Sequence, residues 1–125
     1  MQVITTKFHG KLDYLTGVLL IALPWILGFN DVPVATWAVI FVGVAIIMMS
    51  LFTDYESGIV KAISMATHLN IDIVTGLLLA ASPWIFGFAD QVFLPHLIAG
   101  LYETIVALMT SRNAPGQPIN ELHGL

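Results

Sequence analysis

Four long stretches with almost no charged residues restrict the fold of this chain more than any other feature. They cover residues 14–30, 32–53, 73–89 and 91–111. Only Glu103, in the last stretch, carries a charge. A helix needs about 20 residues to cross a bilayer, and about 17 are sufficient. The apolar positions run continuously and do not alternate, so helices are favoured over barrel strands. The sequence therefore predicts an all-α membrane protein with four transmembrane helices.

The composition excludes several classes of protein. Charged residues make up 10% of the 125 residues and hydrophobic residues 58%, whereas an ordinary soluble domain has about 25% charged residues. The chain has no cysteine, which excludes a disulfide scaffold and a cysteine zinc site. Four scattered cations make no basic patch, so we expect no nucleic acid as a partner. The sequence has no glycine-rich phosphate loop and no nucleophile with a plausible triad, so we do not expect an enzyme.

The distribution of charge predicts the orientation. All the Lys and Arg residues fall on one side of the predicted four-helix topology: Lys7, Lys11, Lys61 and Arg112. The two connections on the other side carry only Asp31 and Asp90. Cytoplasmic segments of membrane proteins are enriched in Lys and Arg. We therefore expect both the N-terminus and the C-terminus to be cytoplasmic.

The chain contains an internal duplication. The segment HGKLDYLTG at 9–17 matches HLNIDIVTG at 68–76, and LPWILGF at 23–29 matches SPWIFGF at 82–88. Later in each repeat, Gly43 pairs with Gly100 and Thr53 pairs with Thr110. The repeating unit is a helical hairpin. Two such tandem hairpins predict a four-helix bundle with pseudo-two-fold symmetry about the membrane normal.

We interpret residues 1–125 as a single integral membrane domain. Repeat one covers about 8–54 and repeat two about 67–111, while 112–125 reads as a flexible tail because of its proline and glycine content.

The duplicated motif resembles a known family. Ser-Pro-Trp followed by Gly-Phe at 82–88, with Leu-Pro-Trp in its place at 23–29, is similar to the SPW repeat family of prokaryotic integral membrane proteins. The first repeat departs from the pattern, because Leu23 stands where serine is expected. The resemblance implies a four-span unit in the prokaryotic cytoplasmic (inner) membrane. It implies no established reaction and no catalytic residues.

The Pro-Trp motifs predict helix ends. Proline removes a backbone donor and clashes with the preceding turn, so we expect Pro24 and Pro83 to bend or unwind their helices. The hydroxyl of Ser82 is placed to bond a carbonyl that the proline frees. The remaining packing and turn residues of these motifs are Trp25, Gly28, Trp84 and Gly87.

A His-x-x-x-Asp-x-x-x-Gly pattern precedes each of these motifs. The spacing of four places His9, Asp13 and Gly17 on one helix face. The second repeat does the same with His68, Asp72 and Gly76. Small residues such as these glycines allow close approach of membrane helices.

Two interpretations of the His/Asp pairs remain open. In the first, each pair is a structural clamp in which an Asp near the helix N-terminus fixes a nearby His. In the second, the pseudo-symmetry gathers both pairs at one depth, where they hold a divalent metal or ligate a tetrapyrrole. The sequence requires no cofactor.

Glu103 lies near the middle of the fourth predicted helix, with His96 and Gly100 on nearly the same face. An acid at membrane depth is by default a functional-site hypothesis. It either holds the bundle together through hydrogen bonds or serves proton-coupled transport or quinone-linked chemistry.

These observations give three hypotheses for the function. The first is a structural or accessory subunit that acts in a homo-oligomer or a larger membrane complex. The second is a metal- or tetrapyrrole-binding membrane protein that uses the paired His and Asp residues. The third is a proton-coupled or quinone-linked component that uses Glu103.

Overall fold

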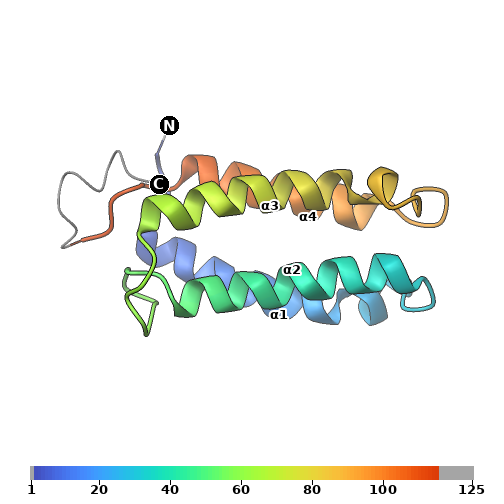
Figure 1. The fold of residues 1–125 in the computed structure, drawn as a ribbon, viewed down its shortest axis with the longest axis horizontal. Helices are drawn as coiled ribbons and strands as arrows, with labels where there is room; N and C mark the ends of the chain where they lie inside the picture. The colour runs from blue at the N-terminus through green and yellow to red at the C-terminus, as the bar shows by residue number, and fades with distance from the viewer. Residues whose placement is uncertain (1, 116–125) are drawn as a thin grey trace.

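The computed structural model describes residues 2–115 and contains four α-helices (Figure 1). They are α1 (Thr6–Leu27), α2 (Pro33–Leu51), α3 (Met65–Ile85) and α4 (Leu94–Met109). Within residues 2–115 the extended backbone pairs only at two isolated bridges, Ile4 with Thr110 and Thr53 with Ile63. The predicted all-α architecture is therefore confirmed. Most of the predicted flexible tail lies outside the described residues.

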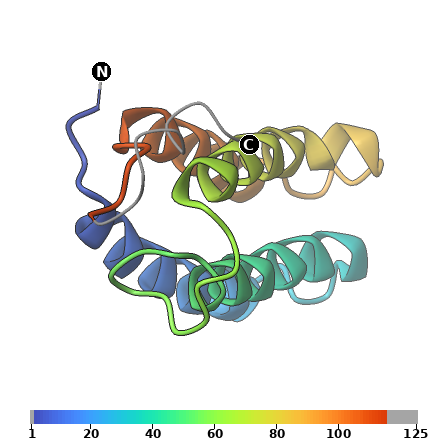
Figure 2. The ribbon, with the colours of Figure 1, turned by 60° about the vertical axis from the view of Figure 1, so that its left-hand side comes forward.

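The helices form two hairpins, α1 with α2 and α3 with α4, which lie side by side (Figures 1 and 2). Packing is most extensive within each hairpin, and α2 and α3 meet less extensively. The two tight turns lie at one end of the molecule. The N-terminus, the α2–α3 connection and the end of α4 lie at the other (Figure 1). This is the arrangement of two tandem parallel hairpins.

Three helices are long and apolar enough to cross a membrane. By length and composition these are α1, α2 and α3, with 22, 19 and 21 residues, whereas α4 is apolar but has 16. The fourth uncharged stretch begins at residue 91, but α4 begins only at Leu94, with Pro95 in its first turn. Proline suits that position because the first helical amides have no intrahelical acceptor. The last helix is therefore shorter than the apolar stretch, interrupted only by Glu103, that predicts it.

Large apolar side chains cover the outside of the bundle. Leu15, Phe41, Val74 and Ile98 are examples of exposed residues, one on each helix. The inward side holds an apolar core near the turns, made of Leu20, Phe29, Ala35, Val39, Ile46, Leu79 and Phe88. An exterior of this kind is suited to lipid. The hydrocarbon chains of lipids solvate apolar side chains as well as a packed protein interior does.

Both prolines lie inside their helices. α1 continues past Pro24 to Leu27, and α3 continues past Pro83 to Ile85. The helices are therefore not unwound at the prolines, and of the expected bending or unwinding only a bend remains as a prediction. The carbonyl that Pro83 cannot bond belongs to Leu79, and the Ser82 hydroxyl donates to that oxygen at 2.7 Å, as the sequence predicts. This bond satisfies the freed carbonyl in α3, whereas α1 runs on past Pro24 with Leu23 at the equivalent position and no such hydroxyl.

The turns after α1 and α3 each depend on a glycine. Gly28 and Gly87 have φ values of 76° and 75°, in the left-handed region that other residues rarely adopt. The carbonyl oxygen of Pro24 accepts from the backbone N–H of Gly28 and from that of Phe29. These glycines end the helices, as the sequence predicts for the turns.

Replacing Gly28 with alanine is expected to cost about 1–2 kcal/mol of stability. No atom lies within 4 Å of an added Cβ, so the cost comes from the backbone conformation alone. Equilibrium unfolding of the protein in mixed micelles measures it. Gly28→Asn is the control, since asparagine adopts this conformation more readily than alanine. Equal losses for both variants would contradict the explanation.

Close backbone contacts join the helices of each hairpin. Gly17 of α1 faces Gly43 of α2, and Gly76 of α3 faces Gly100 of α4. In each pair a Cβ added to one glycine would come closer than 3.0 Å to the carbonyl oxygen of the other. The predicted role of Gly17 and Gly76 in packing agrees with these contacts. The equivalent contact in both repeats reflects the internal duplication.

Candidate functional site

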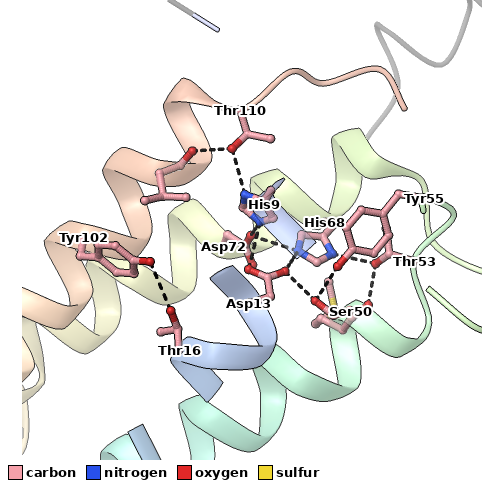
Figure 3. A network of polar contacts seen from close by, with 12 residues as sticks. His9, Asp13, Thr16, Ser50, Thr53, Tyr55, His68, Asp72, Tyr102 and Thr110 are labelled. Atoms are coloured by element: carbon pink, nitrogen blue, oxygen red, sulfur yellow. Dashed lines mark hydrogen bonds and ion pairs between the residues drawn. The ribbon is translucent and has the colours of Figure 1, made fainter. Parts of the chain in front are cut away.

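Two histidines and two aspartates meet inside the bundle near its termini-bearing end (Figure 3). α1 supplies His9 and Asp13, and α3 supplies His68 and Asp72. We call these four residues the His/Asp centre. Their exposed fractions are 1%, 2%, 0% and 4%. Since each helix begins only three residues before its histidine, the first turns of α1 and α3 carry the centre.

Each histidine of the centre faces both carboxylates. His9 Nε2 lies 3.1 Å from Asp13 Oδ1 and 3.1 Å from Asp72 Oδ2. His68 Nε2 lies 3.0 Å from Asp13 Oδ2 and 3.1 Å from Asp72 Oδ2. The contacts within one helix join residues four apart, and the others cross between the hairpins. One ligand atom from each of the four residues lies within 4.8 Å of the others.

A threonine hydroxyl lies behind each imidazole. His9 Nδ1 is 2.9 Å from Thr110 Oγ1. His68 Nδ1 is 2.7 Å from Thr53 Oγ1. Each hydroxyl donates its only proton to the backbone carbonyl four residues earlier, at 2.6 Å and 2.5 Å respectively. The hydroxyl oxygen is therefore an acceptor toward the ring, so Nδ1–H is the donor in both histidines.

These two hydrogen bonds place a proton on Nδ1 of each histidine and so determine the role of Nε2. With the proton on Nδ1, a neutral imidazole presents the lone pair of Nε2 to the carboxylates. Two lone pairs and two carboxylates at about 3 Å repel one another unless a cation lies among them. The centre therefore requires positive charge on its Nε2 side, which either a proton on each Nε2 or a bound cation supplies.

His68 Nε2 has no hydrogen bond in spite of this crowding. It is buried and lies within ion-pair distance of both carboxylates, but its direction satisfies hydrogen-bond geometry to neither. His9 Nε2, in contrast, makes a hydrogen bond with Asp72 Oδ2. A buried polar atom without a hydrogen bond costs free energy. The nitrogen of His68 is thus the least satisfied atom of the centre.

The surroundings of the two aspartates differ. Ser50 Oγ donates to Asp13 Oδ2 at 2.6 Å, and Tyr55 in turn donates to Ser50 Oγ at 2.8 Å. Burial raises the pKa of Tyr55, which favours the protonated, donating phenol. In the second repeat Ala107 occupies the position equivalent to Ser50, so Asp72 lacks this hydroxyl. The centre is pseudo-symmetric in its four residues and asymmetric around them.

Glu103 lies close to the centre but outside it. Its side chain is 5% exposed on α4, and its carboxyl is within electrostatic range of the four residues of the centre. The neighbouring Tyr102 hydroxyl contacts Thr16 Oγ1 at 3.3 Å, which joins α4 to α1. The structure thus places an additional buried acid within electrostatic range of the two aspartates.

His96 belongs to a different part of the molecule. Its Nε2 donates to the backbone oxygen of Ala35 at 2.8 Å. The ring lies between those of Phe29 and Phe88, with centroid distances of 5.3 Å and 4.8 Å. His96 therefore joins the two hairpins near the turns. It takes no part in the centre, although it shares a helix with Glu103.

Sequence reasoning grouped six polar residues as candidates, and the structure brings four of them into one cluster. The sequence patterns did not identify the hydroxyls that support this cluster, which are those of Ser50, Thr53, Tyr55 and Thr110. A signal existed for two of them, because Thr53 and Thr110 are equivalent in the repeats. The structure adds that each of these threonines contacts the histidine of the other repeat.

Replacing Thr53 with valine is expected to destabilise the bundle by about 1–3 kcal/mol, because His68 Nδ1–H loses its acceptor and stays buried. Equilibrium unfolding in mixed micelles checks this value. Thr75→Val makes the same chemical change at a half-buried residue of α3 for which the described residues show no side-chain hydrogen bond, so it serves as the control. Equal stability of the two variants would contradict the role given to Thr53.

The comparison with known proteins agrees with the duplicated architecture. The SPW repeat domain model matches residues 7–110, which include both hairpins and the His/Asp centre. The chain belongs to the SPW repeat domain family. No curated protein and no solved structure matches it. With its apolar helices, this SPW repeat protein is a multi-pass membrane protein that resides in a lipid bilayer.

Proposed function

We propose that this SPW repeat protein is a structural or accessory subunit of a membrane complex or homo-oligomer, and not an enzyme. One observation carries the proposal. The His/Asp centre links α1 to α3 by contacts that cross between the hairpins, while the outer face of every helix presents large apolar side chains. The buried polar groups of the centre thus hold the hairpins together inside the bundle. The apolar exterior is available for contact with lipid or with neighbouring helices.

The centre acts as a clamp between two loosely packed hairpins. α2 and α3 meet far less extensively than the helices within each hairpin. In a bilayer, apolar faces gain little from associating, since lipid tails solvate them equally well. Polar contacts such as His9–Asp72 and His68–Asp13 therefore decide how the two repeats are held. A fixed relative position of the repeats gives the exterior a defined shape for a partner.

The proposed orientation places the centre at the cytoplasmic side of the inner membrane of a prokaryote. Lys7, Lys61 and Arg112 belong to segments at the termini-bearing end, and the two turns at the opposite end carry Asp31 and Asp90. The bias of Lys and Arg toward cytoplasmic segments supports cytoplasmic termini.

Site-specific photo-crosslinking in the native membrane tests the subunit role. A photoreactive residue at exposed Leu15 or Phe41 is expected to give an adduct of one defined mass, from a second copy or from another protein. The same photoreactive residue at Val39, which is buried, is the control and is expected to give no protein adduct. A chain that forms no protein adduct from any lipid-facing position would overturn the proposal.

Glu103 supports a second candidate function, proton-linked transport or a quinone-linked role. The observation that favours it is a buried carboxyl within electrostatic range of two histidines and two aspartates, and acids and histidines inside a membrane often serve proton relay. Proton flux into liposomes that contain the purified protein tests it. We would then expect Glu103→Gln to abolish the flux. Absence of flux with the unmodified protein would eliminate this candidate.

A further inference from the structure

We propose that His9, Asp13, His68 and Asp72 form a binding site for one zinc-class divalent cation, held by two imidazole Nε2 atoms and two carboxylate oxygens. This inference goes beyond a structural clamp because it names a ligand for the centre. It depends on the geometry inside one chain and not on any partner protein.

The ligand set has the number and type of ligands of a tetrahedral zinc site. Zinc binds imidazole nitrogen and carboxylate oxygen at about 2.0–2.2 Å, so neighbouring ligands of a tetrahedron lie about 3.3 Å apart. The four nitrogen–oxygen distances in the centre are 3.0–3.1 Å. These distances involve both oxygens of Asp13, and one ligand atom from each residue lies within 4.8 Å of the others. Small shifts of the side chains would thus bring four ligand atoms to a common ion.

The imidazoles have the orientation that metal-binding histidines adopt. A histidine that binds a metal through one nitrogen almost always donates the other N–H to an oxygen, which fixes the ring. His9 and His68 donate Nδ1–H to Thr110 and Thr53. Both Nε2 atoms consequently point into the centre. Because the two threonines come from opposite repeats, the same support exists on both sides of the site.

The unsatisfied nitrogen is an independent sign of a missing ligand. His68 is 0% exposed, and its Nε2 has no hydrogen-bond partner although it is aimed between two carboxylates. A metal ion between the ligands would satisfy this nitrogen through its lone pair. The Ser50 hydroxyl, which donates to Asp13 Oδ2, would remain as an outer hydrogen bond that orients the carboxylate.

Charge balance and size select the class of ion. Two aspartates and two neutral imidazoles carry a charge of −2, so one divalent cation makes a neutral buried site, as a low-dielectric interior requires. Calcium prefers six to eight oxygens and magnesium keeps octahedral geometry with waters, and the centre offers neither. Tetragonal geometry favours copper(II). A tetrapyrrole between the imidazoles would need a flat slot, which Asp13 and Asp72 fill.

The test is zinc stoichiometry and affinity of the full chain in lipid nanodiscs. The protein is stripped with a chelator, titrated with zinc chloride and measured by elemental mass spectrometry and chelator competition. We expect one zinc per chain. The double variant His9→Gln/His68→Gln is expected to lose the stoichiometric ion, while His123→Gln, which lies outside the described residues, retains it. Cobalt(II) provides a second readout, because a tetrahedral site gives it a characteristic visible absorption spectrum.

A milder variant keeps the test valid if the double variant does not fold. Thr110→Val leaves all four ligands in place and removes only the hydroxyl behind His9, so zinc affinity is expected to fall about 10–100-fold. Circular dichroism confirms that the variant remains helical. Absence of stoichiometric zinc in the unmodified protein, or equal affinity of the Thr110→Val variant and the unmodified protein, would overturn the metal site. Neither outcome bears on the crosslinking result, so the subunit role is judged separately.

Discussion

Replacing His68 with alanine is expected to destabilise the bundle by about 3–5 kcal/mol, the range found when one partner of a buried ion pair is removed. Asp13 and Asp72 would then share a single imidazole, that of His9, at less than 5% exposure. The loss of the side chain also leaves a cavity where a fully buried ring packed against Tyr55, at a centroid distance of 5.7 Å. The measurement is equilibrium unfolding in mixed micelles, with a chelator present so that no metal contributes.

Val74→Ala is the control for His68→Ala, since Val74 lies on the same helix and faces outward. We expect it to change stability by less than about 0.5 kcal/mol. A four-fold apolar replacement of the centre, with leucine for each histidine and valine for each aspartate, is expected to cost less than His68→Ala alone, because apolar residues of similar volume often replace a complete buried ionic group without loss. A larger loss for the four-fold variant would show that the centre contributes net stability as a unit.

Replacing Gly100 with alanine is expected to destabilise the α3–α4 hairpin by about 3 kcal/mol, at the upper end of overpacking effects. An added Cβ would overlap backbone atoms of Ala80 and the carbonyl oxygen of Gly76. Backbone atoms of a packed helix cannot move aside as a side chain does, so the two helices must separate. The same unfolding measurement gives the loss in stability.

Two further variants serve as comparisons for Gly100→Ala. Gly17→Ala is expected to cost less, because the nearest atom to its added Cβ, at 2.5 Å, belongs to the Ile47 side chain, which can adopt another rotamer. Ile98→Ala, two residues from Gly100 on the outer face, is expected to change stability little. If Gly100→Ala proved as mild as Ile98→Ala, the close contact of α3 and α4 would not be the source of hairpin stability.

Sequence patterns predict the helices and their repetition because both depend on neighbours along the chain. Long apolar runs require helices in a bilayer, since only internal hydrogen bonds satisfy the backbone there. The spacing of four in His9–Asp13 and His68–Asp72 puts each pair on one helix face whatever the tertiary fold. The turn glycines and the hydroxyl of Ser82 act within a few residues of the prolines. These features could be predicted without a structure.

The effect of Pro24 and Pro83 on their helices could not be predicted from the neighbouring sequence alone. A missing N–H predicts disruption of the helix, but α1 and α3 both continue past their prolines, to Leu27 and Ile85. In α3 the Ser82 hydroxyl donates to the freed carbonyl, and the helix ends only at the following glycine turn. Of the two outcomes expected from the prolines, bending or unwinding, the structure does not show unwinding.

The sequence by itself determined that this protein has four apolar helices in two repeats, with one His/Asp pair at the start of each repeat. Only the tertiary structure decided that His9 contacts Asp72, that Thr53 and Thr110 lie behind the histidines of the opposite repeats, and that His96 instead bonds to Ala35. These contacts join residues 15 to 101 positions apart. The relative positions of these residues depend on how closely the backbones approach at the glycine contacts and on how the hairpins then pack. No periodic pattern in the sequence encodes this packing.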